Sequence, residues 1–129
     1  MEQTPEHTPT YAEAMELLRE YNTHPHLINH ALAVSAVMRH LAEKYGEDPE
    51  KWAIVGLVHD LDYERFPEEH CRKTEEILTE RGWPAEYIRA VVSHGYGMFT
   101  QVEPQSLMEK SLYAVDEPVS YTHLTLPTN

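Results

Sequence analysis

The sequence predicts an all-α protein, a bundle of about six helices, and two observations support this prediction. Prolines stand near the starts of the expected helices, and glycines follow the ends of several of them. Proline suits the first helical turn because the N–H that it lacks would have no partner there, and glycine suits the residue after the last turn. No segment shows a sustained alternation of apolar and polar residues bounded by turn residues, which is the pattern of a half-buried strand.

These prolines and glycines predict where each helix starts and ends. The second expected helix is long and ends before Gly46, and the fourth and fifth end before Gly82 and Gly95. The expected ranges are 9–21, 25–45, 49–60, 67–81, 84–94 and 104–116.

The length of the chain indicates a single core. Its 129 residues fall within the ~100–200 residues that one domain commonly contains. The apolar fraction of 41% and the charged fraction of 25% are ordinary for a globular protein, so a packed interior is expected. We divide the chain into an N-terminal helix with its lead-in (1–22), the main helical domain (23–118) and a tail (119–129).

The tail, VSYTHLTLPTN, differs sharply from the charged chain before it. It contains no charged residue and three threonines, and its wording resembles translated cloning or adapter sequence. We expect it to be non-native, with the natural chain continuing differently after about Pro118. No function is assigned to the tail, including its His123.

The sequence contains no targeting or membrane signal that can be recognised. The N-terminus lacks a basic segment followed by an apolar run, and no stretch approaches the ~18 apolar residues of a membrane span. We therefore expect a cytoplasmic protein with no membrane partner.

The acidic charge balance argues against one class of partner. Ten Lys and Arg residues stand against 22 Asp and Glu residues, and the formal net charge of −12 would repel a nucleic-acid polymer. A small anionic substrate remains compatible, because a bound divalent cation can dominate the field inside a site. The single cysteine, Cys71, excludes an internal disulfide and a thiolate-rich zinc site. Histidine must therefore carry any metal chemistry.

Several ionisable residues lie at helical spacing from apolar neighbours, on the side of each helix expected to face the core. Burying imidazoles and carboxylates is costly unless they share a compensating centre, and a metal ion is such a centre. Asp60 directly follows one of these histidines and is the natural bridge between two ions. Taken alone, this His-Asp pair also fits a hydrogen-bonded pair at a helix end. The residues on the apolar stripes are His30, His59, His70, His94 and Asp116.

The remaining histidines are expected at the surface. They stand in the terminal segment, beside a proline, or on a helix face that we expect to be hydrated. They are His7, His24, His26 and His40. Imidazole and carboxylate ligands suit iron, manganese, zinc, cobalt or nickel.

Taken together, the ordered segments NHALAV, GLVHDLDYE, PEEH, VVSHG and EKSLYAVDE, which carry these residues, resemble the HD superfamily of metal-dependent phosphohydrolases. The resemblance spans roughly residues 20 to 118 and implies a helical HD-domain bundle that binds one or two divalent metal ions. It implies a first ion held by His30, His59, Asp60 and Asp116. A second ion would be held by His70 and His94, with Asp60 between the two, and this two-metal form is the preferred interpretation.

The sequence departs from one common version of the family motif, in which glycine and lysine closely follow the His-Asp pair. Asp62 and Tyr63 stand there instead, so that cationic phosphate contact is missing. Arg65, Lys73 and Lys110 are the candidates to bind a phosphate, although each also fits a solvated surface residue.

The resemblance predicts hydrolysis of a phosphate ester of a nucleotide or similar small metabolite by a metal-bound hydroxide. Asp60 and Asp62 are the candidate catalytic carboxylates, and the sequence does not single out a general base. Two other functions remain open: a di-iron oxygenase of the same fold, and a non-catalytic metal-stabilised module that binds a nucleotide or a partner. The oligomeric state is also open.

Overall fold

The computed structural model describes the backbone of residues 8–121 and the side chains of residues 8–115. Within that range the protein is all-α, as predicted, and its one β-type contact is an isolated bridge between Tyr96 and Thr100. The helices are α1 (Tyr11–Tyr21), α2 (Pro25–Tyr45), α3 (Pro49–Val58), the 3₁₀ helix η1 (Pro67–Glu69), α4 (Arg72–Glu80), α5 (Ala85–Ser93) and α6 (Leu107–Tyr121).

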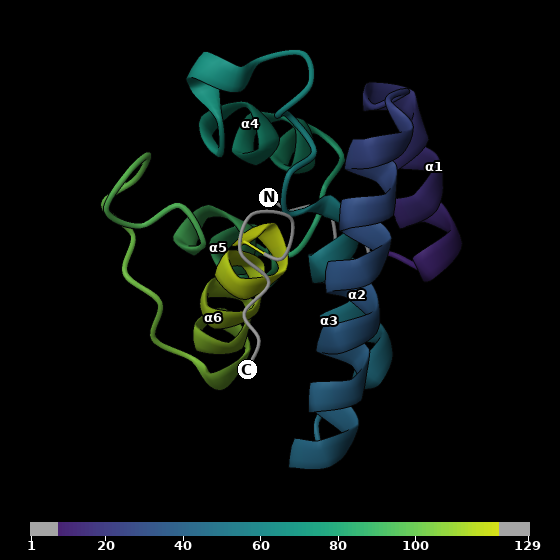
Figure 1. Ribbon diagram of the computed structural model, residues 1–129, viewed down its shortest axis with the longest axis vertical. Helices are drawn as coiled ribbons and strands as arrows, with labels where there is room; N and C mark the ends of the chain where they lie inside the picture. The colour runs from purple at the N-terminus through teal and green to yellow at the C-terminus, as the bar shows by residue number, and fades with distance from the viewer. Residues whose placement is uncertain (1–7, 122–129) are drawn as a thin grey trace, which may run out of the picture.

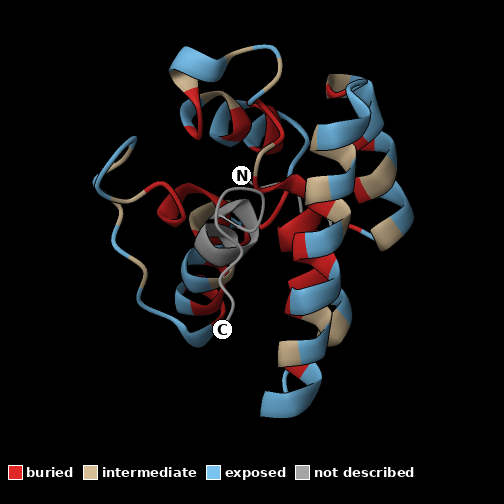
Figure 2. Cartoon of the chain, viewed as in Figure 1, coloured by how far each residue is buried: buried red, intermediate tan, exposed pale blue. Residues whose placement is uncertain are grey.

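The apolar helix α3 lies inside the bundle, with α1, α2 and α5 packed against it (Figure 1). Every residue from Trp52 to Val58 is buried, and a helix that is apolar on all sides is stable only in such a position. Buried positions on the surrounding helices face inward toward it (Figure 2). The last residues of α3 therefore lie in the protein interior.

Helices α2 and α3 approach each other closely at Gly56. A Cβ atom added at Gly56 would lie 2.8 Å from Ser35 Cα, so only glycine fits there without a shift of the backbone. The Ser35 hydroxyl donates a hydrogen bond to the Ala53 carbonyl oxygen across the same contact, at 2.8 Å. This contact fixes the position of α3 relative to α2.

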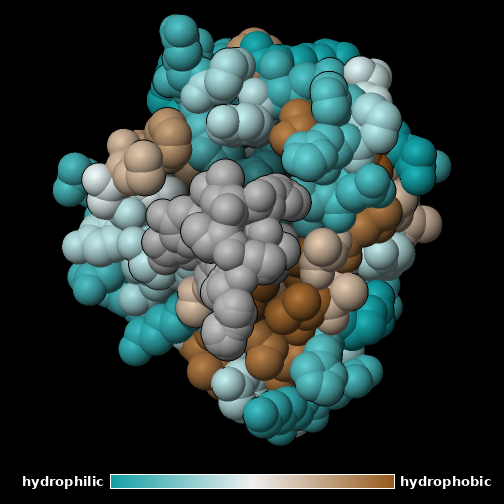
Figure 3. Space-filling view, viewed as in Figure 1, coloured by the Kyte–Doolittle hydropathy of each residue, from teal (hydrophilic) through white to brown (hydrophobic). Residues whose placement is uncertain are grey.

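The face of the molecule in Figure 3 is mostly hydrophilic, with apolar side chains gathered in one region beside α2. Val37 of this helix is 38% exposed. Among the described residues, no helix combines the length and the apolar character needed to cross a bilayer.

Two helices, α1 and α6, have boundaries that differ from the predicted ones. In α1, Thr10 Oγ1 accepts from the Glu13 N–H and Glu13 Oε1 accepts from the Thr10 N–H, which forms a capping box. The helix therefore begins after Thr10 rather than at Pro9, because the capping residue itself is not helical. At the other end of the chain, α6 starts at Leu107 and extends past the predicted end into the expected tail.

The single helix predicted over 67–81 is wrong. The structure has the short η1, then a break at His70 and Cys71, and only then α4. Cys71 has φ 76° and its side chain does not cap the helix. The Asp62 carboxylate instead accepts the Thr74 N–H in the first turn of α4, at 2.9 Å. A side chain from a distant turn thus replaces the local cap, and His70 lies in a break rather than on α4.

Gly56→Ala is expected to destabilise the protein by about 1–3 kcal/mol, which is the usual effect of overpacking a tight contact. At an unobstructed helix position the same change stabilises by roughly 0.5–1 kcal/mol, so the sign of the effect is diagnostic. Urea unfolding followed by circular dichroism measures it. An unfolding free energy equal to or above that of the wild type would contradict the close approach of α2 and α3.

Candidate metal centre

Five side chains that the sequence assigned to a metal meet in one group, called here the histidine cluster. Three of them come from helices or helix ends, since one lies within α2 and two are the C-cap residues of α3 and α5. The others lie in the turn after α3 and in the break before α4. The cluster consists of His30, His59, Asp60, His70 and His94.

The Asp60 carboxylate stands at the middle of the cluster and divides the imidazoles into two pairs. Its Oδ2 lies 3.5 Å from His30 Nε2 and 3.3 Å from His59 Nε2. Its Oδ1 lies 3.1 Å from His70 Nε2 and 3.3 Å from His94 Nε2. One carboxylate thus presents a separate oxygen to each pair of ring nitrogens.

The helix ends fix the tautomer of two rings. His59 Nδ1 lies 2.7 Å from the Gly56 carbonyl oxygen, and His94 Nδ1 lies 2.5 Å from the Val91 carbonyl oxygen. A carbonyl oxygen only accepts, so Nδ1 carries the proton in each ring and a neutral ring is left with a lone pair on Nε2. Both lone pairs then face the Asp60 carboxylate. Two acceptors facing each other are repulsive unless a proton or a metal cation lies between them, so the donor set fits a metal ion once that proton is displaced.

The distances also suit metal coordination. Two nitrogen ligands at ~2.0–2.1 Å from a tetrahedral ion lie about 3.3 Å apart. His70 Nε2 and His94 Nε2 are 3.2 Å apart, and their distances to Asp60 Oδ1 are 3.1 and 3.3 Å. These three atoms are therefore spaced as the ligands on one face of a coordination tetrahedron would be. On the other side of the carboxylate, ligand atoms of His30, His59 and Asp60 lie within 4.8 Å of one another.

Asp62 orients the His70 ring by binding Nδ1, the ring nitrogen that does not face Asp60. Asp62 is fully buried, and its Oδ1 lies 2.6 Å from His70 Nδ1 while its Oδ2 accepts the Thr74 N–H. A carboxylate that holds the outer nitrogen of a histidine fixes the ring and makes the inner nitrogen a better ligand. Both oxygens of Asp62 are thus engaged within the protein, which suits a positioning role. That Asp60 or Asp62 accepts a proton in a reaction stays a prediction.

The carboxylate and the imidazoles of the cluster shift one another's pKa values. Burial raises the pKa of Asp60, but the charge of His59 and hydrogen bonds from the surrounding imidazoles outweigh it and hold this pKa well below its usual value. Burial lowers the pKa of His70, but hydrogen bonds to Asp60 and Asp62 outweigh it and raise this pKa to about 12. At neutral pH the carboxylate is therefore ionised and His70 carries a proton.

Two of the cationic side chains predicted to bind phosphate contact other protein groups instead. The Arg65 guanidinium donates to the Glu20 carbonyl oxygen at 2.9 Å and lies 5.1 Å from the centre of the Tyr21 ring. Lys73 Nζ lies 3.3 Å from a Glu76 carboxylate oxygen and 5.1 Å from the centre of the Phe66 ring.

The other two predicted site residues lie in α6. Lys110 is exposed there. Asp116 also belongs to this helix, and its side chain is outside the part of the chain that the structure describes. The structure therefore describes the side chains of three of the four ligands expected for the first metal ion: His30, His59 and Asp60.

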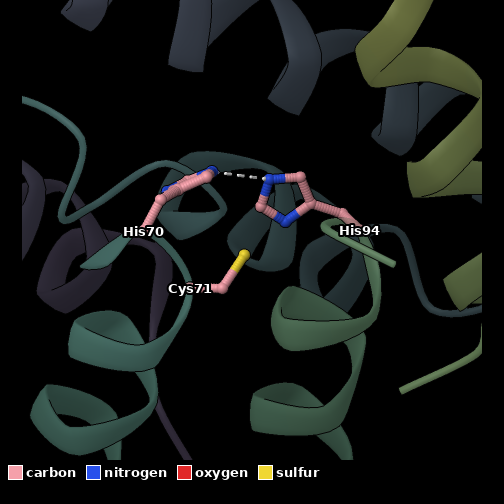
Figure 4. Close-up of side chains that lie close together, drawn as sticks. All are labelled: His70, Cys71 and His94. Carbon is pink, nitrogen blue, oxygen red and sulfur yellow. Dashed lines mark hydrogen bonds between the residues drawn. The ribbon is translucent and has the colours of Figure 1, made fainter. Parts of the chain in front are cut away.

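Three residues that the sequence analysis did not assign to the site lie beside His70. The Tyr63 and Phe99 rings meet the imidazole edge-on, with centroids 5.5 and 4.9 Å away, and both side chains are about half exposed. Cys71 places its sulfur close to the ring nitrogens of His70 and His94 (Figure 4). The aromatic contacts join separate loops, and no periodic pattern marks them. For Cys71, adjacency to His70 was the one available signal.

Comparison with known proteins gives one match. A protein-family model described as HD domain matches residues 27–117, a range that contains the whole histidine cluster and Asp116. No curated protein and no solved structure matches the chain.

Metal binding at pH 7 is expected to release protons, one of them from His70, because a metal-ligating histidine must be neutral. Below the raised pKa of His70, protons compete with the metal for the ring nitrogen of this residue. The apparent metal affinity therefore rises with pH. Calorimetry with Zn²⁺ in buffers of different ionisation enthalpy counts the protons. His70→Gln should lower the count by about one, whereas His40→Gln, at an exposed position, should leave it unchanged. A heat of binding that does not depend on the buffer would count against this assignment.

Proposed function

Because the chain belongs to the HD-domain family, we propose that it is a metal-dependent phosphohydrolase. Its substrate would be a phosphate ester of a nucleotide or a similar small metabolite, and two divalent metal ions would be bound. The observation that supports this most directly is the Asp60 carboxylate, which offers one oxygen to His30 and His59 and the other to His70 and His94. A carboxylate in this position suits a bridge between two ions.

Divalent ions bound there would supply an activated water molecule and positive charge for the phosphoryl oxygens. The protein's own residues hold this centre in place. His59 and His94 are locked in one tautomer by carbonyl oxygens of their own helices. Asp62 fixes the ring of His70. Preorganised ligands of this kind need little rearrangement during a reaction, which favours catalysis.

The surroundings of the cluster favour a substrate with a flat apolar part. Tyr63 and Phe99 are 45% and 46% exposed and both contact His70, so they can meet a substrate bound beside that ring. Aromatic side chains stack on planar groups such as a nucleobase. Since Arg65 and Lys73 make other contacts, the bound ions would provide most of the positive charge that a phosphate requires.

A panel of nucleotides and simple phosphate esters, each tested with added Mn²⁺, Fe²⁺, Co²⁺, Ni²⁺ and Zn²⁺, tests the proposal. Phosphate release is expected from at least one substrate. The double variant His59→Gln/Asp60→Asn should lose more than the ~10–100-fold that is typical of removing an outer partner of a metal ligand. His40→Gln, an exposed histidine, is the matched control and should retain activity.

The outcomes separate the proposal from its rivals. Phosphate release that survives the double substitution would refute it. Oxygen uptake by the iron-loaded protein, without phosphate release, would favour a di-iron oxygenase. Saturable nucleotide binding with no turnover by the metal-loaded protein would favour a non-catalytic module.

A further inference from the structure

We propose that the thiol of Cys71 is a protein ligand of the metal ion held by His70, His94 and the Oδ1 atom of Asp60. This proposal rests on the metal centre of the proposed function and not on the reaction carried out there. It would give the second metal position a sulfur ligand beside its two nitrogens and one oxygen.

The Cys71 sulfur lies close to the imidazoles of His70 and His94. The Cys71 side chain is fully buried, and its Sγ lies with one ring nitrogen each of His70 and His94 in a group whose atoms are all within 4.8 Å of one another. In Figure 4 the sulfur points into the space between the two imidazoles. Three side chains that commonly bind metals therefore converge on one point.

The backbone explains how two consecutive residues reach the same point. Neighbouring side chains on a continuous helix point about 100° apart and diverge. His70 and Cys71 instead occupy the break between η1 and α4, where His70 has ψ 140° and Cys71 has φ 76°. The break lets both side chains enter the cluster, which a continuous helix over 67–81 would prevent.

Gly95 makes room for the sulfur. A Cβ atom added at Gly95 would lie 2.6 Å from Cys71 Sγ, so the thiol occupies space that any side chain there would take. Gly95 directly follows His94. The sulfur is therefore packed against the chain segment that carries one of the two imidazoles.

The donor chemistry agrees with this position. Asp60 Oδ1 and the Nε2 atoms of His70 and His94 lie 3.1 to 3.3 Å from one another, a spacing that suits three ligands on one face of a tetrahedron. A tetrahedral ion needs one more ligand, and zinc accepts a cysteine sulfur at ~2.3 Å. On binding, the S–H bond breaks, a sulfur–metal bond forms and the proton passes to solvent, with no change of oxidation state. A thiolate favours zinc, cobalt or iron over magnesium or manganese, which prefer oxygen ligands.

Cobalt substitution tests the proposal without any activity measurement. The full chain loaded with Co²⁺ is expected to show the near-ultraviolet charge-transfer absorption of a thiolate bound to cobalt. Cys71 is the only cysteine in the sequence, so such a band has one possible source. Cys71→Ser should abolish the band and weaken Co²⁺ binding by about tenfold or more. Circular dichroism of the metal-free proteins checks that the variant folds.

Gly95→Ala is a second variant that keeps the thiol and displaces it. It is expected to weaken the same band and the Co²⁺ affinity, whereas His40→Gln should alter neither. Cobalt bound without the band, or with the same affinity in wild type and Cys71→Ser, would overturn the role of Cys71 and leave the metal centre standing. Failure of the wild type to bind cobalt would overturn the metal centre together with this proposal.

Discussion

The partly buried carboxylate of Asp60 is the group around which the histidine cluster is organised. Four imidazole Nε2 atoms lie 3.1 to 3.5 Å from its two oxygens. Grouping so many ionisable side chains out of water is unfavourable unless their charges and lone pairs are compensated. In the metal-free protein a proton on His70 supplies part of that compensation. A pair of metal ions would supply it more completely, because each oxygen and each pair of rings would then share a cation.

The fold provides this arrangement mainly through helix ends. α3 and α5 both finish with a histidine whose Nδ1 is held by a carbonyl oxygen three residues earlier in the same helix. The last turn of each helix thus positions a ligand and selects its tautomer. The break before α4 adds His70 and Cys71, and Asp62 both caps α4 and fixes His70. The same contacts that end or begin helices therefore build the centre.

Helical periodicity was sufficient to predict part of this centre. His30, His59 and His94 lie within regular helices or at their ends, where spacing from apolar residues reports which side faces the core. His70 joins the cluster as predicted, but from a backbone break that periodicity does not reveal. The left-handed backbone of Cys71 is a tertiary feature with no signal in the spacing of residues. The contacts of the long cationic side chains, such as Arg65 and Lys73, were the hardest to predict. They depend on which neighbouring group lies within reach of the side chain in the folded protein.

The chemistry of the site follows from how its ligands are held. Rings fixed by carbonyl oxygens and by Asp62 keep their inner nitrogens directed at the two oxygens of the Asp60 carboxylate, so little reorganisation is needed when ions bind. The aromatic rings of Tyr63 and Phe99 lie next to His70 and are accessible from outside. Anomalous diffraction from crystals of the zinc-loaded protein would locate the bound ions. We expect one peak on each side of the Asp60 carboxylate, one beside His30 and His59 and one beside His70 and His94. Zinc bound only away from Asp60 would show that this carboxylate does not bridge two ions.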